Sequence, residues 1–222
     1  MTETSPLQSF WLSFEGRSLA IYHRILSGTC RWQVNGRENI TLAESSKRPL
    51  LWVFWHGQLS PMVTFLNRFY DPRNIVMVTI GGDERGQILQ QFARSLHASP
   101  HAVDMSGNPM AAGRAVLRII QEMKAGKHSF IAPDGPDGPP FEPKPGALFL
   151  AKKARAALIP VGAYARPAYN LRRWDKYNIP LPFSRIQLEV GPPIFVDKAV
   201  DEEQLSSQLS DTLSTLYARA RA

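Results

Sequence analysis

Short apolar runs, each ended by glycine, proline or a charged residue, alternate along the chain with segments whose apolar residues recur at helical spacing. Residues 50–55 are apolar without a break, which is typical of a strand buried on both faces of a sheet. Further strands are predicted at 31–34, 74–80, 101–105, 128–132, 157–164 and 185–190, and helices at 58–69, 83–96, 109–124, 145–155 and 201–219. This alternation predicts one α/β domain with a mostly parallel or mixed sheet flanked by helices.

The N-terminal segment has the pattern of an amphipathic helix. Ser5 followed by Pro6 is typical of a helix start, and Gly28 of a helix end. The apolar residues between them that recur at helical spacing are Leu7, Phe10, Trp11, Phe14, Ile21, Tyr22, Ile25 and Leu26. We therefore divide the chain into an N-terminal helix, 1–30, and an α/β domain, 31–222. The aromatic stripe could lie in a bilayer interface, but we favour packing on the sheet, because most amphipathic helices cover their own core.

The composition and net charge limit which binding partners and which cellular compartment we expect. The chain has 26 Lys and Arg against 19 Asp and Glu, a net charge of +7, which favours an anionic partner. No apolar run approaches the roughly 18 residues that a membrane-spanning helix needs, and the N-terminus lacks the positive start of a signal peptide. Any membrane contact is therefore expected to be peripheral. The single cysteine excludes an intramolecular disulfide and favours the cytosol.

The segment 166–184 is predicted to be a long loop, and long loops in compact domains are usually functional or mobile. Its basic and aromatic residues, Arg172 to Trp174 with Lys176 and Tyr177, would suit a lipid headgroup region or a nucleic-acid strand. Only this loop and the net charge favour a nucleic-acid-binding module, and we expect no nucleic-acid partner.

Ionisable and glycine-rich groups follow the ends of several predicted strands: His56, Gly81 to Glu84, Ser106 and Asp134. If these strands are parallel, the groups lie at one edge of the sheet, where open α/β folds bind ligands. The pKa range of a histidine such as His56 suits proton abstraction near neutral pH, although a structural cap of the strand remains an alternative.

The loop 133–140 combines carboxylates with prolines that restrict φ and glycines that allow close backbone approach to a ligand. An ordinary cluster of turns is the alternative. Lys144 could meet an anion and Arg85 a phosphate, although each alone is more typical of solvated surface. His97 and His101 are separated by Pro100, which breaks the helix that would align them, so no metal site is expected.

Taken in order, several segments resemble the lysophospholipid acyltransferase superfamily, and in particular its branch of bacterial proteins long catalogued as a domain of unknown function. The resemblance extends from about Val34 to Val196. It rests on 55–57 (Trp-His-Gly), 133–136 (Pro-Asp-Gly-Pro), 144–146 (Lys-Pro-Gly), 158–161 (Leu-Ile-Pro-Val), 174–175 (Trp-Asp) and 179–184 (Ile-Pro-Leu-Pro-Phe-Ser).

The resemblance implies a glycerolipid-acyltransferase-like α/β fold, peripheral on the cytoplasmic, inner face of a membrane. It also implies transfer of a fatty acyl group from a thioester, on coenzyme A or acyl carrier protein, to a lipid hydroxyl, with no bound cofactor. His56 matches the catalytic histidine of the superfamily, as general base. Gly57 adjoins this histidine, and Asp134, Gly135 and Pro136 match the substrate loop.

The chain departs from the superfamily pattern at two positions. The aspartate that usually follows the histidine by five positions, and orients its ring, is replaced by Pro61. Asp83, Glu84 and Asp134 are the substitutes we consider, besides a backbone carbonyl.

Second, an arginine of the substrate loop is replaced by Asp137, which would repel a phosphate unless Lys144 or Arg85 compensates.

From these residues we predict an acyltransferase of the lysophospholipid class. The predicted catalytic residues are His56, Asp134 and Asp83, and the predicted substrate-binding residues are Gly57, Arg85, Ser106, Gly135, Pro136 and Lys144. Backbone amides around Gly135 and Lys144 are candidates to stabilise the oxyanion. The alternative is a non-catalytic lipid- or acyl-binding peripheral membrane protein with a degenerate site, which Pro61 and Asp137 favour.

Overall fold

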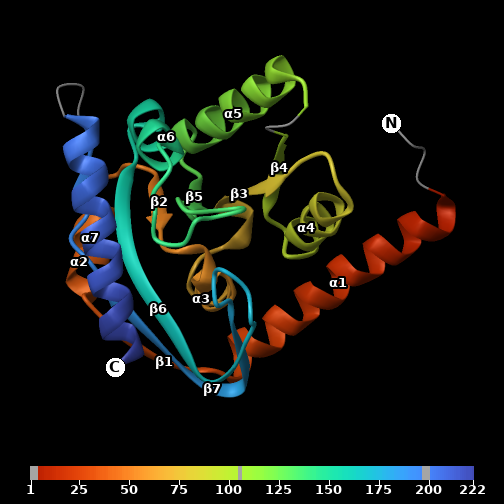
Figure 1. The fold of residues 1–222 in the computed structure, drawn as a ribbon, viewed down its shortest axis with the longest axis horizontal. Helices are drawn as coiled ribbons and strands as arrows, with labels where there is room; N and C mark the ends of the chain where they lie inside the picture. Colours follow the sequence, from red (N-terminus) through yellow and green to blue (C-terminus); the bar gives the residue numbers. More distant parts are fainter. Residues whose placement is uncertain (1–4, 105–106, 197–200) are drawn as a thin grey trace.

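The computed structural model describes residues 5–104, 107–196 and 201–222, which form an α/β fold with a mixed sheet between two layers of helices (Figure 1). The strands are β1 Arg31–Asn35, β2 Leu50–Val53, β3 Ile75–Ile80, β4 Ser99–Val103, β5 His128–Ile131, β6 Ala157–Asn170, β7 Asn178–Val190 and β8 Ile194–Phe195. The helices are α1 Pro6–Thr29, α2 Arg37–Ser45, α3 Leu59–Phe69, α4 Glu84–Ser95, α5 Pro109–Lys124, α6 Gly146–Ala154 and α7 Glu202–Arg221, with 3₁₀ turns η1 His56–Gln58 and η2 Pro72–Asn74.

The predicted fold class is confirmed. The strand order is β1-β7-β6-β2-β5-β3-β4, with β8 paired to β6. Strand β2 runs parallel to both β5 and β6, and β3 runs parallel to both β5 and β4. Strand β7 pairs antiparallel with β6 and parallel with β1, so the sheet is mixed. The carboxyl ends of β2, β5, β3 and β4 therefore meet at one edge.

The sheet buries a hydrophobic cluster on each face, and β2 contributes to both. Trp52 and Phe54 point into a cluster with residues of α1, α3 and α4, whereas Leu51, Val53 and Trp55 point into one with residues of α5, α6 and α7. This alternation explains why the whole run is apolar: neither face of β2 meets solvent.

The prediction of a long loop over 166–184 is wrong, because β6 and β7 form a long antiparallel hairpin there. The strand pair was not predicted because polar residues and prolines interrupt the apolar pattern of both strands. The ladder is irregular between Arg166 and Ala168, the place where Pro167 has no N–H to donate. The Asn178 side chain accepts from the N–H of Ala165 (2.9 Å) and so replaces a ladder bond. In Figure 1 the tip of this hairpin turns back beside α3.

Helix α2 was not predicted, and it begins after Gly36, whose φ of +81° favours glycine.

Helix α1 packs against the domain with the face opposite to the predicted one. Its buried residues are Leu12, Gly16, Ala20, His23, Leu26 and Ser27. Most of the stripe predicted to cover the core points outward instead, and the exposed members are Leu7, Phe10, Trp11, Phe14, Ile21 and Ile25. Small inward residues allow a close approach, since a Cβ on Gly16 would lie 2.7 Å from the Ile88 carbonyl oxygen of α4.

A buried polar cluster joins α1 to α3. The His23 Nδ1 lies 2.9 Å from Thr64 Oγ1, and Ser27 Oγ accepts a hydrogen bond from Asn67 Nδ2 (2.9 Å). Burial lowers the pKa of His23 to about 4 from an ordinary value of 6.5, because desolvation penalises the charged form of the ring.

This burial makes stability depend on pH. Between pH 6.5 and about 4 the unfolded chain binds a proton at His23 that the folded chain does not, so the free energy of unfolding falls as pH drops through this window. We expect His23→Gln to flatten that part of the pH dependence, measured by urea unfolding at several pH values. An unchanged pH dependence in the variant would show that His23 is not the group responsible.

Candidate active site

His56 and Asp134 meet at the carboxyl edge of the sheet. His56 follows β2 and starts η1, and Asp134 follows β5, the parallel neighbour of β2. The His56 backbone N–H donates to Asp134 Oδ1 (2.8 Å), and the Phe141 N–H donates to Oδ2 (3.3 Å). Burial raises the pKa of Asp134, and these two hydrogen bonds oppose that rise. Asp134 thus fixes the backbone of His56 and the loop 134–141, while the imidazole ring has a different partner.

The partner of the imidazole is Asp175, which lies in the tip of the β6–β7 hairpin. His56 Nδ1 and Asp175 Oδ2 are 2.8 Å apart. The Asp175 side chain is fully buried, whereas the His56 side chain remains 16% exposed. Arg173 Nη2 lies 3.4 Å from the same carboxylate oxygen. A buried carboxylate on Nδ1 orients the ring and leaves the other nitrogen, Nε2, for chemistry.

Sequence reasoning did not single out Asp175 for this role. The pair Trp174-Asp175 is one of the segments on which the resemblance rests, and this match was the signal that could have identified Asp175. Asp175 lies 119 positions after His56, in a segment predicted to be a loop, so no local pattern places the two side by side. Position 61 lies within α3, where the buried Pro61 offers no carboxylate.

Two glycines next to His56 leave the room that this arrangement needs. A Cβ on Gly57 would lie 2.1 Å from the Asp175 carbonyl oxygen, and one on Gly135 would lie 2.6 Å from His56 Cδ2. The ring of Trp174 lies 5.3 Å from the His56 ring, centroid to centroid, and also packs against Gly138. The hairpin tip and the loop 134–141 therefore close around the histidine from two sides.

The loop amides proposed for the oxyanion are already engaged. The Gly135 N–H donates to the Ala132 carbonyl (3.1 Å), and the Lys144 N–H donates to the Pro133 carbonyl (2.9 Å). The Lys144 ammonium donates to the Gly135 carbonyl (3.0 Å), and Pro136 is exposed at the surface of the loop. Gly135, Pro136 and Lys144 thus lie on the loop that follows β5, but the N–H groups of Gly135 and Lys144 already have acceptors in the same loop.

Asp83 and Arg85 lie further along the same edge, at the start of α4. Asp83 caps the helix by accepting from the Gly86 N–H (2.8 Å), and it accepts from Arg85 Nε (2.7 Å). Strand β3, which precedes them, is separated from β2 by β5. Asp83 therefore orients the start of α4, and the ring of His56 is held by Asp175. Ser106 lies outside the described residues.

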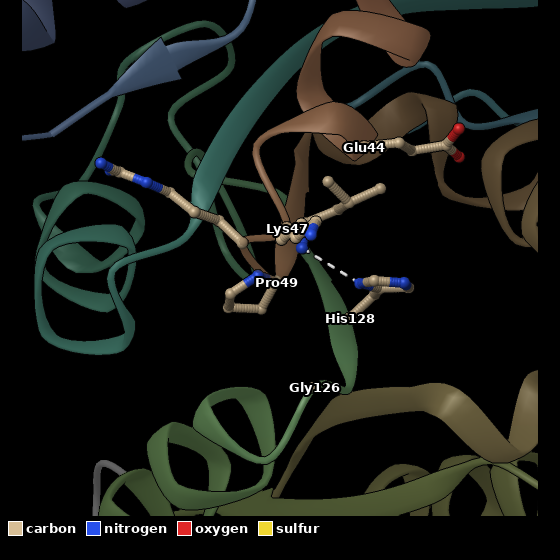
Figure 2. Close-up of a pocket in the computed structure, with 7 residues that line it drawn as sticks. Glu44, Lys47, Pro49, Gly126 and His128 are labelled. Carbon is tan, nitrogen blue, oxygen red and sulfur yellow. Dashed lines mark hydrogen bonds between the residues drawn. The ribbon is translucent and has the colours of Figure 1, made fainter.

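A cavity of about 320 Å³ lies at the other edge of the sheet, and Figure 2 shows it. His128 and Leu50 line it at the amino ends of β5 and β2, and the Leu50 N–H donates to His128 Nδ1 (3.1 Å). Its other lining residues are Glu44, Lys47, Arg48, Pro49 and Gly126. Because His56 follows the carboxyl end of β2, this cavity is separate from the His56 site. Over the described parts of the chain, no cluster of His, Cys, Asp and Glu could hold a metal ion.

Comparisons with known proteins bear on the fold. No family model matches the sequence. The chain is 27% identical over 175 residues to an uncharacterized protein of Rickettsia prowazekii (strain Madrid E), covering 77% of this chain and 76% of that protein. Its structure is similar to the crystal structure of the 1-acyl-sn-glycerophosphate acyltransferase PlsC from Thermotoga maritima, with a TM-score of 0.59 and 16% identity over 97% of this chain and 80% of that one. The chain therefore has an acyltransferase-like fold.

The two glycines provide a test of the geometry. We expect Gly57→Ala to move the hairpin tip away from His56, because the new Cβ would overlap a backbone oxygen. The expected result is a lower melting temperature and disorder of the 171–177 tip in hydrogen exchange. Gly113→Ala in α5 is the matched control, since a Cβ there meets nothing within 4 Å. Equal protection of the tip in both variants would contradict the placement of Asp175 against Gly57.

Proposed function

We propose that the protein is an acyltransferase that moves a fatty acyl group from a thioester to the hydroxyl of a lipid, with His56 as the general base. The observation that carries the proposal is the His56–Asp175 pair at the carboxyl edge of a sheet with an acyltransferase-like fold. A partly exposed histidine on a buried carboxylate is an arrangement suited to proton transfer.

The hydrogen bond to Asp175 determines which nitrogen of the His56 ring carries the proton. A carboxylate can only accept, so Asp175 holds the proton on Nδ1 and leaves Nε2 unprotonated. Nε2 takes the proton of the acceptor hydroxyl as its oxygen attacks the thioester carbonyl. The tetrahedral intermediate then collapses, the C–S bond breaks, and the imidazolium returns the proton to the leaving thiolate. Asp175 stabilises the imidazolium in between.

The substrates in this proposal are a lysophospholipid-type acceptor and an acyl thioester of coenzyme A or acyl carrier protein, with no bound cofactor. The proposed substrate contacts are Gly57 and Gly135, which adjoin His56, and Pro136 and Lys144, which lie on the same loop as Gly135. Arg85 is the further cation that we propose for an anionic part of a substrate, although Asp83 and also Asp137 raise its pKa and compete for its charge. Asp134 acts as a positioning residue through the His56 backbone.

We further propose that the protein acts peripherally at the inner face of a bacterial membrane, where such acceptors lie. Within the described ranges, no helix is both long enough and apolar enough to cross a bilayer.

Substitution of the proposed base gives the first test. We expect His56→Ala to abolish acyl transfer from labelled acyl-CoA or acyl carrier protein to a mixed pool of lysolipid and lipid hydroxyl acceptors, with the fold unchanged by circular dichroism. Full transfer by this variant would refute the role of His56. No transfer by folded wild-type protein with any donor would favour the non-catalytic lipid-binding alternative.

Removal of the carboxylate charge gives a second test. We expect Asp175→Asn to lower kcat about a hundredfold or more with a small change in KM, because the amide no longer stabilises the imidazolium. Asp83→Asn, which alters a carboxylate at the same edge that caps α4, is the control and should change kcat far less. Equal losses in the two variants would mean that Asp175 has no special relation to the base.

A further inference from the structure

Helix α1 exposes its bulky side and buries its small side. The exposed fractions of the outward residues are Leu7 68%, Phe10 61%, Trp11 53%, Phe14 52%, Ile21 56% and Ile25 47%. The inward face includes Gly16, Ala20 and Ser27, which let α1 lie close to the domain. A helix that only covered its own core would have the opposite arrangement. The outward face therefore lacks a partner within the described chain and calls for one outside it.

The outward residues lie along one side of α1, interrupted between Phe14 and Ile21 by the exposed Ser18. Their spacing of three, four or seven positions places them on the same side of the helix. Trp11 also contacts both Phe10 and Phe14 edge to face, with ring centroids 5.8 Å apart in each pair. From Leu7 to Ile25 the stripe extends over about 27 Å at 1.5 Å per residue.

A second apolar element lies beside the C-terminal half of α1. Between Pro180 and Arg185 the strand β7 bulges out of its pairing with β6, and the bulge exposes Leu181 (41%) and Phe183 (71%). The Tyr22 hydroxyl of α1 donates to the Pro180 carbonyl, which ties the bulge to the helix. Figure 1 shows the start of β7 next to the end of α1.

The backbone of the bulge holds Phe183 in an unfavourable conformation. Its φ is +68°, in the left-handed region that bulky side chains rarely adopt. Ser184 fixes the bulge, because its Oγ accepts from the Leu181 N–H (2.9 Å). Among the described residues nothing covers most of the Phe183 ring, so a partner that covers it would account for the strained conformation.

We propose that the outward face of α1 and the Leu181–Phe183 bulge together dock on the surface of an anionic lipid bilayer, with α1 lying in the plane of the membrane. Arg17 and Arg24 are exposed and seven positions apart, so they form a basic row along one flank of the stripe, and α1 carries only one acidic residue, Glu15. Aromatic rings with flanking arginines are typical of helices that lie in the bilayer interface. An antiparallel pairing with a second copy of the chain would place these arginine rows on the same side, whereas an anionic bilayer complements their charge.

Vesicle flotation tests this proposal without any turnover. The probes are vesicles of phosphatidylcholine alone and of phosphatidylcholine with phosphatidylglycerol. We expect wild-type protein to bind the anionic vesicles, and the triple variant Phe10→Ser, Trp11→Ser, Phe14→Ser to bind them at least about tenfold more weakly, because it loses the three rings that would insert into the bilayer. Phe183→Ser should weaken binding to a smaller degree. The matched control is Met110→Ser with Leu117→Ser on α5, which removes residues of similar exposure, 72% and 58%, and should leave binding unchanged.

The contribution of the basic row, Arg17 and Arg24, is measured separately. Arg17→Gln should reduce the preference for anionic over neutral vesicles, with salt acting in the same direction. Absence of vesicle binding by the wild type, or equal binding by the wild type and the triple variant, would overturn the proposal. A dimer in solution that the triple variant abolishes, without vesicle binding, would assign the surface to a second copy and would also overturn it. None of these outcomes depends on whether the protein transfers acyl groups.

Discussion

The hydrogen bond between His56 and Asp175 joins two parts of the molecule with different strand arrangements. His56 is fixed by a buried strand in the parallel part of the sheet, while Asp175 is carried by the tip of an antiparallel hairpin. For the two to meet, the hairpin must turn back over the edge of the sheet, and Gly57 must lack a side chain. The site therefore depends on long-range packing, and the carboxylate has almost no contact with solvent once it is in place.

Two polar side chains of the hairpin replace or add to its backbone hydrogen bonds. Asn178 supplies a hydrogen bond that the backbone of a regular ladder would make, and Ser184 holds the bulge that precedes Arg185. The bulge interrupts the strand pair and exposes two apolar side chains beside α1. One irregularity in β7 thus belongs to the surface proposed to meet lipid and lies in the same hairpin as the tip that positions the base.

Much of the sheet could be predicted from the sequence, because local patterns determine it. The unbroken apolar run of β2 and the turns after β3 and β5 placed His56 and Asp134 at one edge, and their hydrogen bond agrees with that placement. Asp175 could not be predicted in this way, since prolines and charges conceal the strands on either side of it. The spacing in α1 identified the apolar stripe but not whether it faces the domain or solvent. The close packing of Gly16 against α4, which decides this, cannot be inferred from the spacing. Periodicity shows which residues share a face, whereas packing decides which face is buried.

The measurement that tests the central claim most directly is a double-mutant cycle on acyl transfer, with kcat determined for the wild type and Asp175→Asn, and the residual rate at high enzyme concentration for His56→Ala and the double variant. If Asp175 acts only through the ring of His56, the double variant will be no slower than His56→Ala alone. Independent, additive losses from the two substitutions would contradict the account, because they would show that the carboxylate works without the base.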